Sequence, residues 1–333
     1  MTILVTGGAG FIGSHLVDLL IKEGRDTVVI DDLSGGYKEN INFKAKFYQV
    51  DVRDKNRVNQ IINENNITEI FHLAAYAAEG QSFFSPCEIN DINLKPMNNL
   101  IISAVNNNVK RIIQTSSMAV FGDQTPPFQE DMPRKPVDPY GAAKTYCEQM
   151  LEIYNKEFGL EYCIIRPHNI YGSRQNIADP YRNVLGIWMN RIMRDKPPII
   201  YGDGEQTRAF SYIEDIIKPL ANAGFRERAN KQIINLGSSE VVTVNEACKI
   251  VCDAMGYDKQ PVYLDARPGE VKHAHCTIER SRNILGYETK HTFKQGVIKM
   301  AEWAKTKGAT EPTYTLPLEI TKNAPKPWVN RSM

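Results

Sequence analysis

The chain has 333 residues, of which 42% are hydrophobic and 24% charged, values that are ordinary for a globular protein and exclude wholesale disorder. Its 40 Lys and Arg residues are balanced by 39 Asp and Glu residues, so a net charge of +1 offers no footprint for nucleic acid or for an anionic membrane. At roughly 150 residues per domain, the length indicates about two domains.

Three further classes of protein are disfavoured, namely membrane-spanning, secreted and disulfide-stabilised proteins. No apolar run reaches the roughly 18 residues that a membrane span needs, and the N-terminus lacks the basic flank and apolar stretch of a secretory signal. We therefore expect a cytoplasmic protein. Six cysteines are too few for a disulfide framework. Cys248 and Cys252 lie four residues apart in a predicted helix without further ligands nearby, so we expect reduced thiols and no metal site.

Strands and helices alternate through the first half of the chain. Apolar runs predict the strands, and helical periodicity predicts the segments between them. Such alternation implies right-handed βαβ units, a parallel sheet and a doubly wound α/β fold. The predicted strands are 2–6, 27–31, 45–51, 69–74, 111–116 and 161–166, and the predicted helices are 13–23, 53–65, 93–107 and 140–158.

The second half is less regular. Turn signals stand at 197–198 and 202–204, and helical periodicity returns at 244–256 and 292–307. The last segment, 309–333, is rich in Pro, Thr and Lys, and we expect a tail that hugs the surface or is partly disordered.

A glycine-rich loop joins the first predicted strand to the first helix. Gly7, Gly10 and Gly13 permit a tight turn and let the backbone approach a pyrophosphate. The helix N-terminus adds free N–H groups and the positive end of its dipole. We predict that this loop, with Phe11 and Ile12, binds a dinucleotide.

The second strand ends on a carboxylate. Asp31 follows Gly13 by 18 residues, and a carboxylate there accepts hydrogen bonds from ribose hydroxyls and repels a 2′-phosphate. Asp32 comes next, and no Lys or Arg stands between residues 27 and 37. The sequence therefore favours NAD over NADP.

A Tyr-x-x-x-Lys pair opens the helix at 140–158. Tyr140 and Lys144 share one helical face. A free phenol has a pKa of about 10, but an adjacent ammonium or a positively charged nicotinamide favours the phenolate, which makes Tyr140 a candidate acid/base. Ser116 and Ser117 end the preceding strand; a hydroxyl there can donate to the same substrate oxygen or simply cap a turn.

These motifs, with four others, occur in the order found in the extended short-chain dehydrogenases. The chain resembles their nucleotide-sugar epimerase/dehydratase branch, most of all the UDP-glucose 4-epimerases, over roughly residues 1–305. The motifs are Gly7–Gly13, Asp31, His72–Ala75, Thr115–Ser117, Tyr140 with Lys144, Arg166–Asn169 and Arg267–Glu270.

The resemblance implies a Rossmann-type, doubly wound parallel sheet that holds NAD and a smaller C-terminal α/β domain that holds a nucleotide-diphosphate sugar. We place the NAD-binding domain at 1–166, with a return of the chain at 209–237, the nucleotide-sugar domain at 167–208 and 238–310, and a surface tail at 311–333. The implied catalytic residues are Ser117, Tyr140 and Lys144.

Further site residues follow from the motifs and the resemblance together. For NAD we expect Gly7, Gly10, Phe11, Ile12, Gly13, Asp31, Asp32, Asp51, Val52, Leu73, Ala74, Ala75, Tyr140 and Lys144. For the sugar nucleotide we expect Glu79, Ser117, Asn169, Asn183, Tyr201, Arg208, Arg267 and Ala274. The two arginines would offset the diphosphate charge.

The residues after Ser117 bear on the reaction. Dehydratases of this branch carry an Asp-Glu pair there, and the UDP-glucuronate decarboxylases carry a Glu two residues on, whereas this chain has Met118 and Ala119. Neither can move a proton, which favours 4-epimerisation through a 4-keto sugar. A 4-keto-sugar reductase or another epimerase on this fold, and a non-enzymatic NAD-binding regulator, remain alternatives.

Two positions bear on the substrate and one pattern bears on assembly. By resemblance, Ala274 stands beside the 2-substituent of the sugar, where a small residue would admit 2-acetamido sugars. A carboxylate at Glu79 would repel a uronic acid.

The resemblance also implies a homodimer built on the helices 93–107 and 140–158. The candidates for its apolar face are Leu100, Ile101, Ala104, Met150 and Tyr154.

Overall fold

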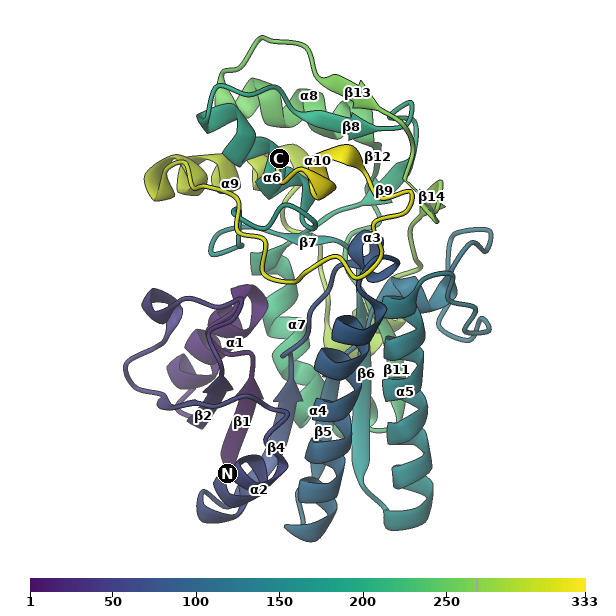
Figure 1. Cartoon of the computed structure of the whole chain (residues 1–333). Helices are drawn as coiled ribbons and strands as arrows, with labels where there is room; N and C mark the ends of the chain where they lie inside the picture. The colour runs from purple at the N-terminus through teal and green to yellow at the C-terminus, as the bar shows by residue number, and fades with distance from the viewer. Residues whose placement is uncertain (268) are drawn as a thin grey trace.

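The structure is a computed structural model that describes residues 1–267 and 269–333. A seven-stranded sheet forms its larger half, with every strand parallel to its neighbours in the order β11-β6-β5-β4-β1-β2-β3 (Figure 1). The strands are β1 (Thr2–Thr6), β2 (Asp26–Asp31), β3 (Lys46–Gln49), β4 (Ile67–His72), β5 (Arg111–Thr115), β6 (Glu161–Pro167) and β11 (Gln232–Leu236). This is the doubly wound parallel sheet that the sequence predicts.

Helices cover both faces of this sheet. One face packs against α1 and α7 through Leu16, Leu20 and Ile216, and the other packs against α2, α4 and α5 through Ile61 and Leu151. The strand order reverses between β1 and β4, and ligands bind at such a switch point outside the carboxyl ends of the strands. The helices are α1 (Phe11–Lys22), α2 (Lys55–Glu64), α4 (Pro86–Asn106), α5 (Pro139–Phe158) and α7 (Ile213–Phe225).

The smaller half stands over those carboxyl ends (Figure 1). It buries a separate core, in which Trp188, Met189, Val251, Val297 and Met300 pack together. Its helices are α6 (Val184–Met193), α8 (Val244–Met255) and α9 (Phe293–Lys307). Its strands are β8 (Ile199–Tyr201), β9 (Thr207–Ala209), β12 (Val241–Thr243), β13 (Val262–Leu264) and β14 (His273–Ala274), and the short strands β7 (Ile170–Tyr171) and β10 (Ser211–Tyr212) pair beneath it.

One helix begins earlier than the sequence predicts. The helix expected from residue 93 is α4, which begins at Pro86. Proline suits the first turn of a helix because its missing N–H has no partner there. A second proline, Pro96, lies inside α4 and interrupts the apolar periodicity. The first two turns therefore give little periodic signal.

The segment 309–333 is not partly disordered, as one reading of the sequence had it. It crosses between the two halves and ends in the short helix α10 (Lys326–Val329), with the side chains of Trp328 and Met333 buried (Figure 1). Its content of proline and polar residues predicted little regular structure. The segment is ordered because it packs on surfaces that exist only once the rest of the chain has folded.

The apolar face proposed for a homodimer is wrong at three positions. Leu100, Ile101 and Ala104 are buried in the core beneath α4, against their own sheet. The exposed large apolar side chains on these helices are instead Ile102, Ile153 and, at the end of α5, Phe158.

Two findings concern possibilities considered above, a membrane-spanning helix and a metal site. Within residues 1–267 and 269–333, no helix is long and apolar enough to cross a membrane. Within the same residues, no cluster of His, Cys, Asp or Glu side chains has a geometry that could hold a metal ion, and the cysteines are free thiols.

Candidate active site

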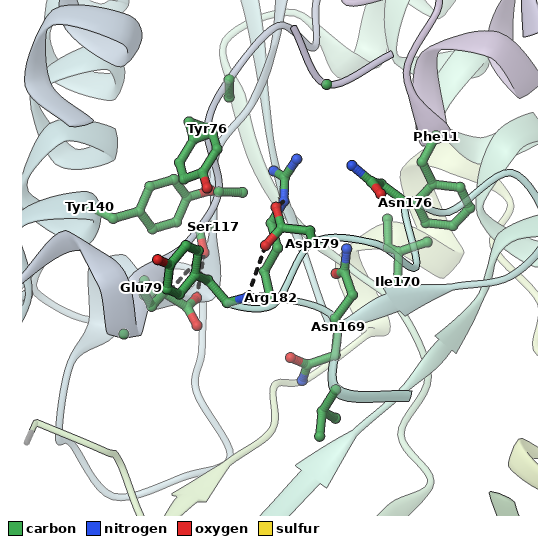
Figure 2. Close-up of a pocket in the computed structure, with 18 of the residues that line it drawn as sticks. Phe11, Tyr76, Glu79, Ser117, Tyr140, Asn169, Ile170, Asn176, Asp179 and Arg182 are labelled. Atoms are coloured by element: carbon green, nitrogen blue, oxygen red, sulfur yellow. Dashed lines mark hydrogen bonds and ion pairs between the residues drawn. The ribbon is translucent and has the colours of Figure 1, made fainter. Parts of the chain in front are cut away.

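A cavity of about 640 Å³ lies between the carboxyl ends of the sheet strands and the smaller half. Every residue assigned above to the cofactor or to the substrate lies along its wall. Figure 2 shows Tyr140, Ser117 and Glu79 gathered on one side of this cavity, with Phe11 and Asn176 across from them. The sequence motifs, which are spread over almost 270 residues, thus converge on one space.

The dinucleotide loop has the backbone that its glycines require. Gly7 takes a left-handed φ of +73°, which side-chain-bearing residues rarely adopt. At Gly13 a Cβ atom would lie 2.1 Å from the Gly7 carbonyl oxygen. Gly10 holds the N-cap of α1 and brings no side chain to its amides. The free N–H groups at this helix end suit a pyrophosphate.

Asp31 is positioned for a ribose. Its carboxylate accepts hydrogen bonds from the amides of Ala9 (2.9 Å) and Leu33 (2.8 Å), which fix it at the end of β2 beside the glycine loop. Burial raises the pKa of Asp31. The residues present therefore fit an NAD molecule, with the loop at its pyrophosphate and Asp31 at its adenosine ribose.

The carboxylate of Asp51 has a partner within the protein. The guanidinium of Arg53 donates to Oδ1 at 3.1 Å and to Oδ2 at 2.7 Å, and also reaches Asp91. Asp51 and Val52 line the cavity, and the Asp51 carboxylate is paired with Arg53.

The catalytic helix α5 is anchored by a buried ion cluster. Glu148 accepts hydrogen bonds from Ser116, Arg134 and Arg166 at 2.5 to 2.9 Å. Burial works against this charge, yet the hydrogen bonds from Arg166 and its neighbours lower the pKa of Glu148. The cluster ties α5 to β5 and β6 and engages the Ser116 hydroxyl with Glu148, which leaves Ser117 as the better candidate for a hydroxyl that acts on a substrate.

The side chains of the Tyr-x-x-x-Lys pair point into the cavity from the first turns of α5. The Lys144 ammonium donates to the Thr115 carbonyl (2.9 Å) and lies 5.7 Å from the centre of the Tyr140 ring. Burial lowers the pKa of Lys144. Ser117 caps the 3₁₀ helix Met118–Phe121 by accepting from the Ala119 amide (3.1 Å), so the capping role considered above is real and coexists with its place on the cavity.

Tyr140 keeps its proton in the protein without ligands. Burial and the charge of Glu79 raise the pKa of Tyr140 well above its usual range, while the Ser117 hydroxyl acts in the opposite direction. The predicted help to the phenolate from the Lys144 ammonium and from a positive nicotinamide therefore has to act against burial and Glu79.

Glu79 reaches the catalytic residues from the short helix α3 (Glu79–Ser82). The Ser117 hydroxyl donates to its carboxylate at 3.5 Å (Figure 2). Burial raises the pKa of Glu79, and the guanidiniums of Arg208 and Arg267 act against that rise. The sequence placed Glu79 near the sugar, and the structure puts it beside Ser117.

The two predicted arginines lie together at the other wall. Arg208 on β9 and Arg267 share the carboxylate of Glu270, at 3.6 and 3.0 Å. Arg267 also stacks over the Tyr201 ring, 5.0 Å from its centre. Both guanidiniums also line the cavity, so this pair can attract a diphosphate there.

The remaining predicted substrate residues, Asn169, Asn183 and Ala274, also lie on the cavity wall. Asn169 donates to the Ala209 carbonyl (2.9 Å), and Asn183 holds the N-cap of α6 with a left-handed φ of +66°. Ala274 is buried on β14 beside Arg208, whereas its neighbours Lys272 and His273 are exposed. Neither neighbour therefore fills the space at Ala274.

Sequence reasoning missed an arginine and a tryptophan on the cavity wall. Arg182 forms an ion pair with Asp179 (2.9 Å) and stacks over the Tyr76 ring, 4.9 Å from its centre (Figure 2). Trp328 comes from the last residues of the chain. Neither stands in a motif; the only signal for Trp328 was an aromatic residue in an otherwise polar tail.

Comparison with known proteins identifies the family. The sequence profile of the NAD dependent epimerase/dehydratase family matches residues 3–237. The chain belongs to this family. Its cofactor is NAD, which the glycine loop and Asp31 fit. A putative UDP-glucose 4-epimerase of Methanocaldococcus jannaschii is 36% identical over 310 residues, which are 92% of this chain and 100% of that relative.

Solved structures of this family have the same fold. The UDP-glucose 4-epimerase of Thermotoga maritima, solved with UDP-glucose, superimposes with a TM-score of 0.87 at 34% identity, over 92% of this chain and 99% of that one. The UDP-N-acetylglucosamine 4-epimerase of Methanobrevibacter ruminantium, solved with UDP-N-acetylmuramic acid, gives 0.85 at 32% identity, over 92% and 98%.

Proposed function

We propose that the protein is an NAD-dependent epimerase that inverts C4 of a UDP-hexose through a transient 4-keto sugar. The observation that carries this proposal is the grouping of Ser117, Tyr140 and Lys144 on one cavity wall, with Met118 and Ala119 at the positions where dehydratases and decarboxylases carry acids. The names of the relatives described above support it.

The proposed roles follow from this geometry. Tyr140 accepts the proton of the 4-hydroxyl and later returns it, and Ser117 donates a hydrogen bond to the same oxygen. Lys144, held by the Thr115 carbonyl, keeps a positive charge close to the phenol. NAD, when bound, supplies a reversible hydride acceptor at C4.

Inversion requires the 4-keto sugar to turn while its nucleotide stays in place. Arg208 and Arg267 would hold the diphosphate, and Tyr201 and Asn183 would lie near the nucleoside. The turned sugar would then present the opposite face of its ring to the hydride donor that bound NAD would supply. Because NAD is regenerated in each cycle, we propose that it stays tightly bound.

The substrate class is further narrowed by two side chains. Ala274 leaves room at the 2-substituent, so we propose that UDP-N-acetylhexosamines are accepted alongside UDP-glucose. The carboxylate of Glu79 beside Ser117 disfavours a second negative charge on the sugar, so UDP-glucuronate should be a poor substrate.

Spectroscopy and product chromatography together test the function. Purified NAD-loaded protein should show reduced-nicotinamide absorbance when a UDP-hexose is added, with the C4 epimer as product and no net consumption of cofactor. A 4-keto-sugar reductase would consume one reduced nicotinamide per turnover. Absence of any turnover with a panel of nucleotide sugars would favour a non-enzymatic NAD-binding regulator.

A further inference from the structure

The C-terminal segment 310–333 is anchored first on the smaller half. Thr310 exchanges two hydrogen bonds with the side chain of Asn190 on α6, at 2.8 and 2.9 Å. The Thr313 amide donates to the Ala178 carbonyl (2.8 Å). These contacts lead the segment from the end of α9 toward the cavity.

The same segment is anchored next on the sheet half. The Glu319 carboxylate accepts from the amides of Cys87 (2.9 Å) and Glu88 (3.2 Å), in the first turn of α4. The Ser85 hydroxyl donates to the Pro317 carbonyl (2.7 Å). An anion at a helix N-terminus is a favourable contact, so the segment bridges the two halves with specific bonds at each end (Figure 1).

Beyond this bridge the chain returns to the smaller half and buries Trp328. The indole is 2% exposed and meets the rings of Phe84, Tyr181 and Tyr201 at steep angles, with centroids 5.1 to 6.3 Å apart. The far edge of its six-membered ring lies 3.2 Å from where a Cβ atom of Gly80 would stand. Trp328 therefore spans from the residue next to Glu79 to the predicted nucleoside end at Tyr201.

The indole N–H of Trp328 is enclosed by protein beside Tyr201. It acts as a hydrogen-bond donor to the Tyr201 phenol and lowers the pKa of that phenol, against the rise that burial causes. Trp328 also lines the cavity, as do Thr315, Leu316 and Met333 of the same segment. The 640 Å³ that remain lie within the range of ligand sites, so the segment forms a wall and does not fill the space.

We propose that residues 310–333 form one wall of the nucleotide-sugar site and that Trp328 is a positioning residue of that wall, which packs against its nucleoside end and holds the Tyr201 phenol in place. This inference rests on the proposed function. The relatives described above are matched over 98–100% of their own length, but the matches cover only 92% of this chain. The part of this chain that they leave uncovered is about as long as this segment.

Calorimetric titration of NAD-loaded, full-length protein with UDP tests the role of Trp328. Trp328→Phe keeps the aromatic wall and removes the N–H, so Kd should rise about 3- to 10-fold. Trp328→Ala removes both and should raise Kd by more than about 10-fold. Trp303→Phe, on α9 and outside the cavity wall, is the matched control and should bind as the wild type does.

Retained NAD absorbance and Tm are measured on each variant, so that loss of folding is seen separately. With a turned-over substrate, Trp328→Phe should raise KM and leave kcat within about twofold, because Trp328 and Tyr201 lie at the predicted nucleoside end of the site and not at C4. Equal or tighter UDP binding by folded Trp328→Ala would overturn this inference alone. Failure of the wild type to bind UDP would overturn both the inference and the proposed function.

Discussion

At the scale of single residues, Tyr140 and Glu79 set the protonation state of the site. Burial and the neighbouring carboxylate both hold the phenol in its neutral form. A neutral phenol is the form that returns a proton to the O4 oxygen, whereas the phenolate is needed to remove one.

Tyr140→Phe tests the acid/base role. We expect turnover to fall about 10²- to 10⁴-fold, because Phe fills the same volume and cannot carry a proton, while NAD remains bound. The measurement is kcat together with NAD content. Tyr154→Phe, on the same helix, is the control and should keep wild-type kcat. A Tyr140→Phe variant with more than half of the wild-type rate would remove Tyr140 from the mechanism.

Ala274→Tyr tests the breadth of the sugar pocket. A phenol ring at this buried position would occupy the space beside the 2-substituent, so kcat/KM for UDP-N-acetylhexosamine should fall at least about 10-fold relative to that for UDP-glucose. Ala274→Ser adds only a hydroxyl and should leave the ratio close to that of the wild type. An unchanged ratio in the Tyr variant would show that Ala274 is not the gate.

At the scale of elements, α5 presents the catalytic pair because both of its ends are defined. Asp138 caps its first turn by accepting from the Gly141 amide (2.7 Å), and Gly159 ends the helix in a left-handed conformation with φ +73°. At Gly141 a Cβ atom would lie 2.7 Å from the Ala119 carbonyl oxygen, so helix and 3₁₀ turn pack backbone to backbone. This close approach places Tyr140 against Ser117.

The N-cap residue of α5, Asp138, makes the free energy of unfolding depend on pH. Burial and the charge of Glu79 raise the pKa of Asp138 from 3.8 to about 6. The folded state therefore binds a proton that the unfolded state has lost, and the stability contributed by this group is present below pH 4 and lost as pH rises toward 6. Asp138→Asn keeps the cap and removes the charge, so it should raise stability at pH 7 by about 1–3 kcal/mol.

Denaturant unfolding of the wild type and Asp138→Asn at pH 4 and pH 7 measures this effect as the difference between the two proteins. Asp54→Asn, at the exposed N-cap of α2, is the matched control. A wild-type-minus-variant difference that stays the same at the two pH values would contradict the assignment.

At the scale of the whole molecule, the cavity is shared between two halves and closed by a third segment. The sheet half contributes the glycine loop and α5, the smaller half contributes Arg208 and Arg267, and the segment 310–333 contributes Trp328. Because two halves supply the walls of the site, its shape depends on how the halves are held together. The hydrogen bonds of Thr310 to the smaller half and of Glu319 to the sheet half connect them through the C-terminal segment.

Assembly is predicted at the same scale. We propose a homodimer through the outer faces of α4 and α5, where Ile102 and Ile153 are 40% and 51% exposed. Light scattering at micromolar concentration should give twice the chain mass, and Ile102→Glu with Ile153→Glu should give monomers, because buried unpaired charges are costly at an interface. Ile298→Glu, at an exposed position on α9, should leave the mass unchanged. A wild-type monomer would contradict the proposal.

The sequence by itself determined the sheet half of the protein. The apolar runs and the glycine loop are local signals: a strand must alternate with a helix to bury its faces, Gly7 needs a left-handed backbone, and a Cβ at Gly13 would meet the Gly7 carbonyl only six residues away. For the same reason six strands, the Asp31 position and the spacing of Tyr140 and Lys144 could be predicted before any contact was known, whereas the seventh strand, β11, was not.

Only the tertiary structure decided which surfaces those elements cover and what else enters the cavity. The periodicity of α4 shows that it has an apolar face, but whether Leu100 meets its own sheet or a partner depends on contacts far away in the chain. Glu79 meets Ser117 across 38 residues, and Trp328 reaches Tyr201 from the last helix of the chain. Such pairs carry no local pattern, because their burial is a property of the assembled halves and not of the segments themselves.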